Sequence, residues 1–246
     1  MYHSITFGQL VSDNEGTTRI SGKNTWDDWH LIPSSRPSVT LPEPNANMVD
    51  IPFRDGGLDI SEAVTGYMTY KDRSGSWEFY IANDYHYWVT LKQTITNYLH
   101  GRKMYVVLED DPEYYYEGRL KVDDFKSQKV NSTITIGYVL KPYKRSIIST
   151  GEDWLWDPFN FDTGFIQNGI IYDVPGTATI IGGRMRVSPT IITSTSGITV
   201  SLNGSTPVLL NSGTNYMSDM FLEEGENVFT FAGSGTVKID YREGSL

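Results

Sequence analysis

The sequence of 246 residues contains no cysteine. Disulfides and thiolate metal sites are therefore excluded, which fits a protein folded in a reducing cytosol but also many secreted proteins. No apolar run approaches the roughly 20 residues that a membrane-spanning helix needs, and Met1–Ser4 does not resemble the basic start of a signal peptide. We therefore expect no contact with a membrane, and any placement at a cell surface would depend on another protein.

Basic residues are also scarce. The formal net charge is −10 and the isoelectric point is about 4.8. Residues 1–145 carry 16 Lys and Arg against 19 Asp and Glu, a net of −3, and residues 146–246 carry 4 against 11, a net of −7. Surfaces that bind nucleic acid are normally built on basic patches. The composition therefore argues against sequence-specific binding of nucleic acid.

Catalytic signatures are missing as well: the sequence has no nucleophile elbow, zinc-protease motif or phosphate-binding loop. The acidic run Glu109–Glu113 lacks the ligand spacing and the glycine of a calcium loop, and we interpret it as an acidic turn facing solvent or the lumen of a pore. The histidines have no ligand spacing, and His100 is interpreted as a partner of a helix dipole. We predict no catalytic, cofactor-binding or metal-binding residues, no cofactor and no enzymatic activity.

The residues that are abundant favour β-structure. The chain contains 23 Gly, 16 Tyr and 6 Trp, and its 39% hydrophobic content is enough for a real core. Strands are predicted over 102–109, 114–122 and 130–140, and a hairpin over 67–82 with its turn at 72–75. The three tyrosines at 114–116 are interpreted as core and strand-pairing residues rather than as a binding platform.

One helix is predicted, at about 84–100. Apolar residues recur there at helical spacing, from Trp88 to Leu99. Asn83 or Asp84 is suited to cap its start, and Gly101 is suited to end it. Its many β-branched residues lower its intrinsic propensity, so we expect this helix to depend on packing against a sheet.

A proline-rich arm is predicted over residues 24–53. Its prolines at 33, 37, 42 and 44 hold the chain extended because each fixes its own φ angle and restricts the preceding residue. The alternation of Val49, Ile51 and Phe53 predicts one face of a short strand. Such an arm cannot form its own core. It should lie along the sheet of its own chain or of a neighbouring copy, which is a first indication of an assembly protein.

The second half of the chain predicts a separate all-β domain. Residues 142–150 form a short basic linker, and 152–164 an aromatic junction in which burial of Trp154 and Trp156 is favoured over sugar stacking. Beyond residue 166, short strands recur every 8–12 residues, as is typical of a β-sandwich. The glycines at 182–183 and 233–235 are interpreted as hairpin turns. The predicted domains are 1–146 and 147–246.

Several segments, taken in order, resemble the distal tail proteins of long-tailed, non-contractile bacteriophages. The likeness covers roughly two thirds of the chain and becomes a general β pattern after about Phe165. The segments that carry it are DWHLIPSSRP (28–37), VDIPFRDGGLDISEAVTG (49–66), SGSWEFYI (74–81), NYLHGRKMYVVLEDDPEYYYEGRLKV (97–122), STITIGYVLKPYKR (132–145), EDWLWDPFNFDTG (152–164) and VKIDYREGSL (237–246).

The resemblance implies a mainly β fold of two β-sandwich-type domains, the first with one packed α-helix and the second galectin-like. It implies a structural virion protein at the distal end of the tail, assembled in the cytoplasm of the host bacterium. Such proteins form a homo-hexameric ring that joins the tail tube protein to a tail-tip or baseplate hub protein and leaves a channel for DNA. The carboxy-terminal domain would face other tip proteins, such as receptor-binding proteins.

Two other functions stay open at this point. The β pattern of 166–246 also suits a carbohydrate- or receptor-binding module of a tail-like particle, although this stretch shows no convergent set of aromatic and polar residues. A cell-wall hydrolase is suggested only by the tail context. Thirty acidic residues make a pair of suitable carboxylates statistically available and therefore uninformative.

Overall fold

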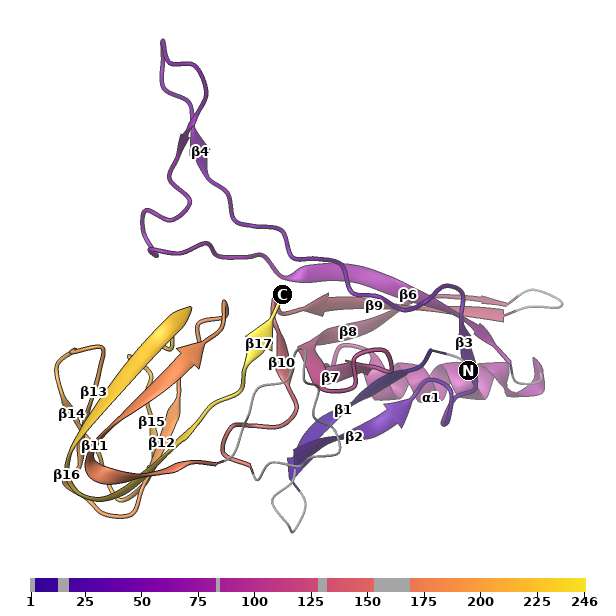
Figure 1. The fold of residues 1–246 in the computed structure, drawn as a ribbon. Coiled ribbons are helices and arrows are strands. Elements are labelled where there is room, and N and C mark those ends of the chain that lie inside the picture. Colours follow the sequence, from indigo (N-terminus) through magenta and orange to yellow (C-terminus); the bar gives the residue numbers. More distant parts are fainter. Residues whose placement is uncertain (1–2, 13–17, 83–84, 128–131, 153–168) are drawn as a thin grey trace. The chain divides into compact units, whose positions relative to one another are not determined.

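The computed structural model describes residues 3–12, 18–82, 85–127, 132–152 and 169–246 (Figure 1). The structure is mainly β, with 51% of residues in strands and 7% in helices, which confirms the predicted fold class. The chain divides into two compact units. The first consists of Met1–Gln9, Ile20–Lys144 and Leu246, and the second of Leu10–Arg19 and Arg145–Ser245. No helix in the described ranges is long and apolar enough to cross a membrane.

The segment 10–19 belongs to the second unit, whereas the predicted division ran at 146/147. Its place is explained by Glu152, whose carboxylate accepts hydrogen bonds from the backbone N–H of Thr18 at 2.8 Å and from its hydroxyl at 2.6 Å. Two residues 134 positions apart are thereby fixed to each other, a pairing that the local pattern of the sequence does not reveal.

The first unit is built on one antiparallel sheet with the strand order β2-β1-β7-β8-β9-β6-β3. A separate two-stranded hairpin is formed by β4 and β5. The bounds are β1 Ile5–Ser12, β2 Thr18–Asn24, β3 Leu31–Pro33, β4 Met48–Val49, β5 Leu58–Asp59, β6 Arg73–Ile81, β7 Lys103–Leu108, β8 Tyr114–Ser127 and β9 Ser132–Leu140.

One helix, α1 (Trp88–Leu99), follows the 3-10 turn η1 (Tyr85–Tyr87), so the regular helix begins four residues later than predicted. Trp88, Ile95 and Leu99 are buried, and α1 packs against β8. Gly101 follows its end with φ +76°, the left-handed conformation that glycine adopts most readily, so the predicted stop is confirmed. The predicted caps at 83–84 lie outside the described residues.

The core of the first unit is strongly aromatic. The rings of Phe7 and Trp29 are stacked at 6.2 Å, and Trp77 lies 6.0 Å from Phe7. Further buried residues alternate along the central strands, as the period of two requires. They include Ile5, Phe79, Val106, Leu120, Ile134, Ile136 and Leu140, all fully buried.

The predicted hairpin over 67–82 is wrong. Its expected turn at 72–75 lies largely inside β6, which pairs with β9 on one side and with β3 on the other. The physical reason is Gly75. A side chain at this position would place its Cβ 2.4 Å from the Tyr138 hydroxyl oxygen, so the glycine makes room for a ring of the facing strand and does not form a turn.

The second unit has a six-stranded sheet with the order β14-β13-β16-β12-β15, and β11 pairs with β16 along its length. The bounds are β10 Lys144–Ser146, β11 Ile171–Gly182, β12 Thr190–Thr193, β13 Thr199–Leu202, β14 Val208–Leu209, β15 Gly213–Tyr216, β16 Gly225–Asp240 and β17 Gly244–Ser245. The short strands β10 and β17 pair with each other. The core contains Ile191, Ile198, Val200, Phe229, Phe231, Val237 and Ile239.

The glycines at 233–235 do not form the predicted hairpin turn; they lie inside β16. Residues 229–232 pair with β13, whereas 237–240 pair with β12, so the strand changes partners across this Gly-Ser-Gly bend. The β11 ladder shifts register at the same level, next to Pro175, which has no N–H to donate. Strands that bend between partners in this way form the corners of sandwich-type sheets. The glycines at 182–183 lie at the end of β11, which does not pair with β12, so they form no hairpin either.

Gly233→Ala should therefore destabilise the second unit. The backbone of Gly233 has φ +121°, and an added Cβ would lie 3.1 Å from the Gly197 carbonyl oxygen. We expect a loss of about 1–3 kcal/mol in the free energy of unfolding. Urea unfolding measures it, with Gly183→Ala as the control, because a Cβ there meets no atom closer than 4.0 Å. Equal losses in the two variants would contradict this role for the bend.

Candidate assembly surface

The proline-rich arm consists of two parts, one that lies along the sheet and one that leaves it. The first, which we call the anchored segment (residues 31–44), lies along the sheet of its own chain. Its strand β3 pairs with β6, with Leu31 opposite Ile81 and Pro33 opposite Phe79. Beyond the ladder, the Ser34 N–H donates to the Glu78 carbonyl oxygen at 2.9 Å. The prolines keep this segment extended, while β6 accepts the few hydrogen bonds that it can make.

Aromatic side chains hold the middle of the anchored segment. The Trp77 indole N–H donates to the Ser38 carbonyl oxygen at 2.8 Å. The Trp77 and Tyr138 rings lie 4.2 Å apart, and the Tyr138 hydroxyl accepts the Thr40 N–H at 3.3 Å. The buried core of the first unit thus extends into the arm through two large side chains.

The buried side chain of Arg73 holds the end of the anchored segment. The Arg73 side chain donates from Nη1 to the Thr40 carbonyl oxygen at 3.1 Å and from Nε to the Pro142 carbonyl oxygen at 2.8 Å. Its guanidinium lies 5.3 Å from the centre of the Tyr116 ring, and the residue is 2% exposed. Burial lowers the pKa of Arg73. No carboxylate in the described ranges pairs with it, so carbonyl dipoles and an aromatic face stabilise the charge.

The acidic turn at 109–113 is more than the solvated surface that we predicted. Asp110 forms an ion pair with Arg36 of the anchored segment at 2.8 Å and a hydrogen bond with His3 Nδ1 at 2.8 Å, and the hydrogen bond from Arg36 contributes most to lowering the pKa of Asp110. Glu109 accepts hydrogen bonds from the Ser4 N–H at 2.6 Å and hydroxyl at 2.8 Å, which lower the pKa of Glu109. These carboxylates therefore contact residues 3–4 and the arm.

Other predicted positions have structural roles. Tyr115 and Tyr116 are buried, as predicted for core residues, and Lys144 lies 4.3 Å from the centre of the Tyr114 ring. His100 follows the end of α1, and its Nδ1 accepts the Val122 N–H at 3.2 Å, so the ring has a hydrogen-bond partner in β8; its pairing with the helix dipole stays a prediction. Trp154 and Trp156 lie outside the described residues. The described ranges contain no group of three or more His, Asp or Glu suited to hold a metal ion.

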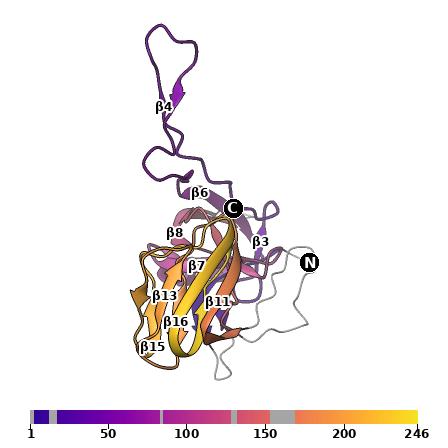
Figure 2. The same ribbon diagram turned by 60° about the vertical axis from the view of Figure 1, so that its left-hand side comes forward.

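The second part of the arm leaves the sheet. At its base, Pro44 bridges to Tyr70, and the Asn45 N–H donates to the Thr69 carbonyl oxygen at 2.9 Å. Beyond it, residues 45–69 form what we call the projecting hairpin, which extends away from the sheet of the first unit in Figures 1 and 2. Its ladder is only two residue pairs long, Met48 with Asp59 and Val49 with Leu58.

The projecting hairpin has no core of its own. No residue between 45 and 69 is buried. Phe53 is fully exposed at the tip, where its backbone has φ +66°, and Val64 is 97% exposed. The other exposed apolar side chains of this hairpin are Met48, Val49, Ile51, Leu58 and Tyr67. A two-stranded ribbon is marginally stable in water, and exposed apolar patches on soluble proteins commonly mark interaction surfaces.

The predicted strand over Val49–Phe53 is therefore only partly right, because β4 ends at Val49. From sequence, alternation of apolar residues indicates a strand with one buried face. Here the alternating residues continue into the tip and are exposed, a pattern that suits burial against another molecule.

No known family model matches the sequence, and no curated protein sequence matches it. Among solved structures, the chain is similar to the crystal structure of SPP1 Dit (gp 19.1), described as a paradigm of the hub adsorption apparatus of phages that infect Gram-positive bacteria. The TM-score is 0.64, the sequence identity is 13%, and the match covers 100% of both chains. The chain thus shares its overall fold with this protein of a phage adsorption apparatus.

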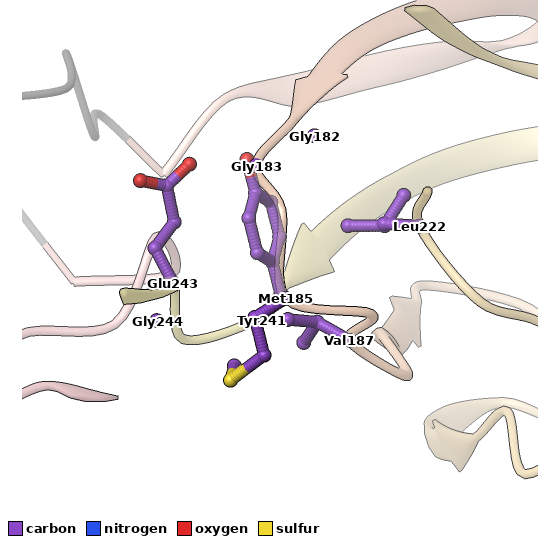
Figure 3. A pocket seen from close by; sticks show the side chains of 8 residues that line it. All are labelled: Gly182, Gly183, Met185, Val187, Leu222, Tyr241, Glu243 and Gly244. Atoms are coloured by element: carbon purple, nitrogen blue, oxygen red, sulfur yellow. The ribbon is translucent and has the colours of Figure 1, made fainter. Parts of the chain in front are cut away.

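A second feature, in the second unit, is a buried carboxyl with one oxygen that is unpaired among the described residues. Glu243 is 9% exposed and lines a small cavity of about 10 Å³ together with Met185, Leu222 and Tyr241 (Figure 3). Its Oε1 has no hydrogen-bond partner in the described part of the chain. Burial raises the pKa of Glu243 to about 7 and also raises that of Tyr241. The cavity is too small for a ligand larger than water.

The stability of the second unit should consequently depend on pH through Glu243. In the folded chain the pKa of Glu243 is about 7, above the ordinary 4.5. The free-energy cost of ionising this buried carboxyl is therefore absent below about pH 4.5, grows as pH rises and is complete above about pH 7. Glu243→Gln should raise stability at about pH 8 by up to about 3 kcal/mol and leave it unchanged near pH 4. Thermal unfolding across this range tests it. Glu224→Gln, which removes an exposed carboxylate of the same unit, is the control, and equal effects would contradict the expectation.

Arg73→Ala should release the anchored segment. The substitution removes two charge-assisted hydrogen bonds and leaves the Thr40 and Pro142 carbonyl oxygens without this donor, so we expect a loss of about 2–4 kcal/mol in the free energy of unfolding. Urea unfolding followed by tryptophan fluorescence measures it. Arg36→Ala is the matched control, since its exposed ion pair should leave the urea midpoint almost unchanged. An equally high urea midpoint in Arg73→Ala and Arg36→Ala would contradict this role of Arg73.

Proposed function

We propose that this chain is a structural protein of a phage tail, a distal tail protein whose copies form a closed ring. The observation that carries the proposal is the projecting hairpin, which exposes the apolar side chains of Phe53 and Val64 and contains no buried residue. The fold shared with SPP1 Dit supports the same class of protein. The proposal includes no enzymatic activity.

A closed ring is the form of assembly that we propose for this surface. In it, copies would meet head to tail, with the projecting hairpin of one copy on a different surface of the next. Such heterologous contacts close into a ring when the rotation between copies allows it. We propose six copies, as in the family that the sequence resembles.

The ring would act as an adaptor at the distal end of the tail. One face would meet the tail tube protein and the other a tail-tip hub protein, and DNA would pass through the central channel without being bound. The second unit, for which we propose a galectin-like fold, would face receptor-binding proteins or other tip proteins. The protein would be assembled in the cytoplasm of the host and would function in the virion.

Assembly should therefore require the apolar tip. Six chains of 27.8 kDa give about 167 kDa, the mass expected for the assembled protein. The double variant Phe53→Ser/Val64→Ser should stay folded, because both side chains are exposed in the single chain. Since a buried Phe or Val contributes about 1.5–3 kcal/mol, the concentration needed for assembly should rise at least about tenfold.

Light scattering with electron microscopy of the same fractions measures this. Tyr216→Ser is the control, because it removes another exposed aromatic side chain, one that lies in the second unit. The proposal predicts a ring with a central hole for the parent and for Tyr216→Ser. Rings formed equally well by the double variant, or a 27.8 kDa parent at every concentration, would contradict it.

A further inference from the structure

A cavity in the second unit gathers basic residues of an otherwise acidic stretch. It has a volume of about 340 Å³ and lies among β10, the loop from β11 to β12, and the end of β16. Residues 145–246 contain five Lys and Arg against eleven Asp and Glu, and three of these five line this cavity. The lining side chains used below are Arg145, Arg186, Arg242, Thr190 and Asp240.

Two of the arginines are held in place by contacts within the unit. Arg186 forms an ion pair with Glu223 at 2.8 Å, and its guanidinium lies 4.5 Å from the centre of the Phe221 ring. Arg242 donates from Nη1 to the Ser146 carbonyl oxygen at 3.4 Å and pairs through Nη2 with Glu152 at 3.4 Å.

The partner of Arg242 is an ionised carboxylate. Burial alone would raise the pKa of Glu152, but hydrogen bonds from Thr18 and Ser149 and the charge of Arg242 lower it overall. Glu152 therefore fixes the Arg242 side chain at the cavity. A guanidinium fixed in this way loses little further side-chain entropy when it binds a ligand.

Arg145 differs from the other two. It is half-buried, and no carboxylate in the described ranges forms an ion pair with it. A positive charge held at a cavity wall, with no carboxylate partner among the described residues, is suited to bind an anionic ligand. Guanidinium groups match the oxygen geometry of phosphate and carboxylate, with which they form paired hydrogen bonds.

The other polar side chains that line the cavity indicate which further groups the ligand carries. Asp240 accepts the Gly151 N–H at 2.8 Å through Oδ1 and keeps acceptor capacity for a hydroxyl donor. Thr190 adds a hydroxyl opposite Asp240 in the β12–β16 ladder. A bare inorganic anion would be repelled by Asp240, whereas a molecule with both an anionic group and hydroxyl groups satisfies both kinds of partner. The volume lies at the small end of ligand pockets.

We propose that this cavity binds a small polyhydroxylated anion, a sugar or polyol carrying a phosphate or a carboxylate. The anionic group lies against the arginines, with Arg145 as its main partner, and the hydroxyls face Asp240 and Thr190. The site lies within a single chain and does not rest on ring formation, so each proposal can fail without the other.

Isothermal calorimetry on the full chain tests the site with glucose 6-phosphate, glucuronate and neutral glucose. The expected result is binding of one or both anionic sugars that weakens with added salt, with glucose at least about tenfold weaker. A preference between the two anionic probes identifies phosphate or carboxylate as the group recognised.

Two charge-removing variants make the test specific. Arg145→Gln should weaken binding at least about tenfold, because it removes a charge-assisted contact. Arg184→Gln, in the same loop as Arg186 but outside the cavity lining, removes the same charge and should bind as the parent does. Equal weakening in both variants, equal binding of glucose, or no binding of either anionic sugar up to about 10 mM would overturn the proposal.

Discussion

The guanidinium of Arg73 determines how the arm of this protein is arranged. It is buried beside the Tyr116 ring, and its hydrogen bonds join the Thr40 carbonyl of the arm to the Pro142 carbonyl just beyond β9. Burying a charge without a carboxylate is costly unless dipoles replace the lost water. Both carbonyls are therefore held in one geometry. The anchored segment is fixed up to this point, and the projecting hairpin begins a few residues later, at Asn45.

This arrangement divides the arm into the anchored segment, which packs against its own chain, and the projecting hairpin, whose apolar side chains are exposed. The anchored segment shares the core of the first unit through Trp77 and Tyr138. The projecting hairpin exposes Phe53 and Val64 and shares none of that core. Because the anchored segment is already ordered, the arm loses less backbone entropy on binding a partner than a wholly free segment would. The second unit contributes a different kind of surface, in which arginines line a polar cavity.

Much of the fold could be predicted from the sequence, because its patterns are local. The alternation in β9, the helix period before Gly101 and the prolines of the arm each act within a few residues. The errors have a common cause, which is a partner distant in sequence. The residues around Gly75 predict a turn, because the contact with Tyr138 across the sheet leaves no local signal. The residues around Gly233 also predict a turn, because a bend inside a strand has the composition of a turn. Likewise, apolar residues such as Phe53 give the same signal whether their own chain or another molecule buries them. The cavity of Arg145 gave no signal, since its lining residues are far apart in the sequence.

The central claim is that the tip of the projecting hairpin contacts another copy of the chain. The most direct measurement replaces Phe53 with a photo-cross-linking phenylalanine analogue and analyses the irradiated, purified protein on a denaturing gel and by mass spectrometry. The account predicts a ladder of cross-linked chains that ends at the hexamer, with position 53 joined to a surface of the neighbouring copy outside its own hairpin. Cross-links confined to single chains under conditions where the protein is assembled would contradict it.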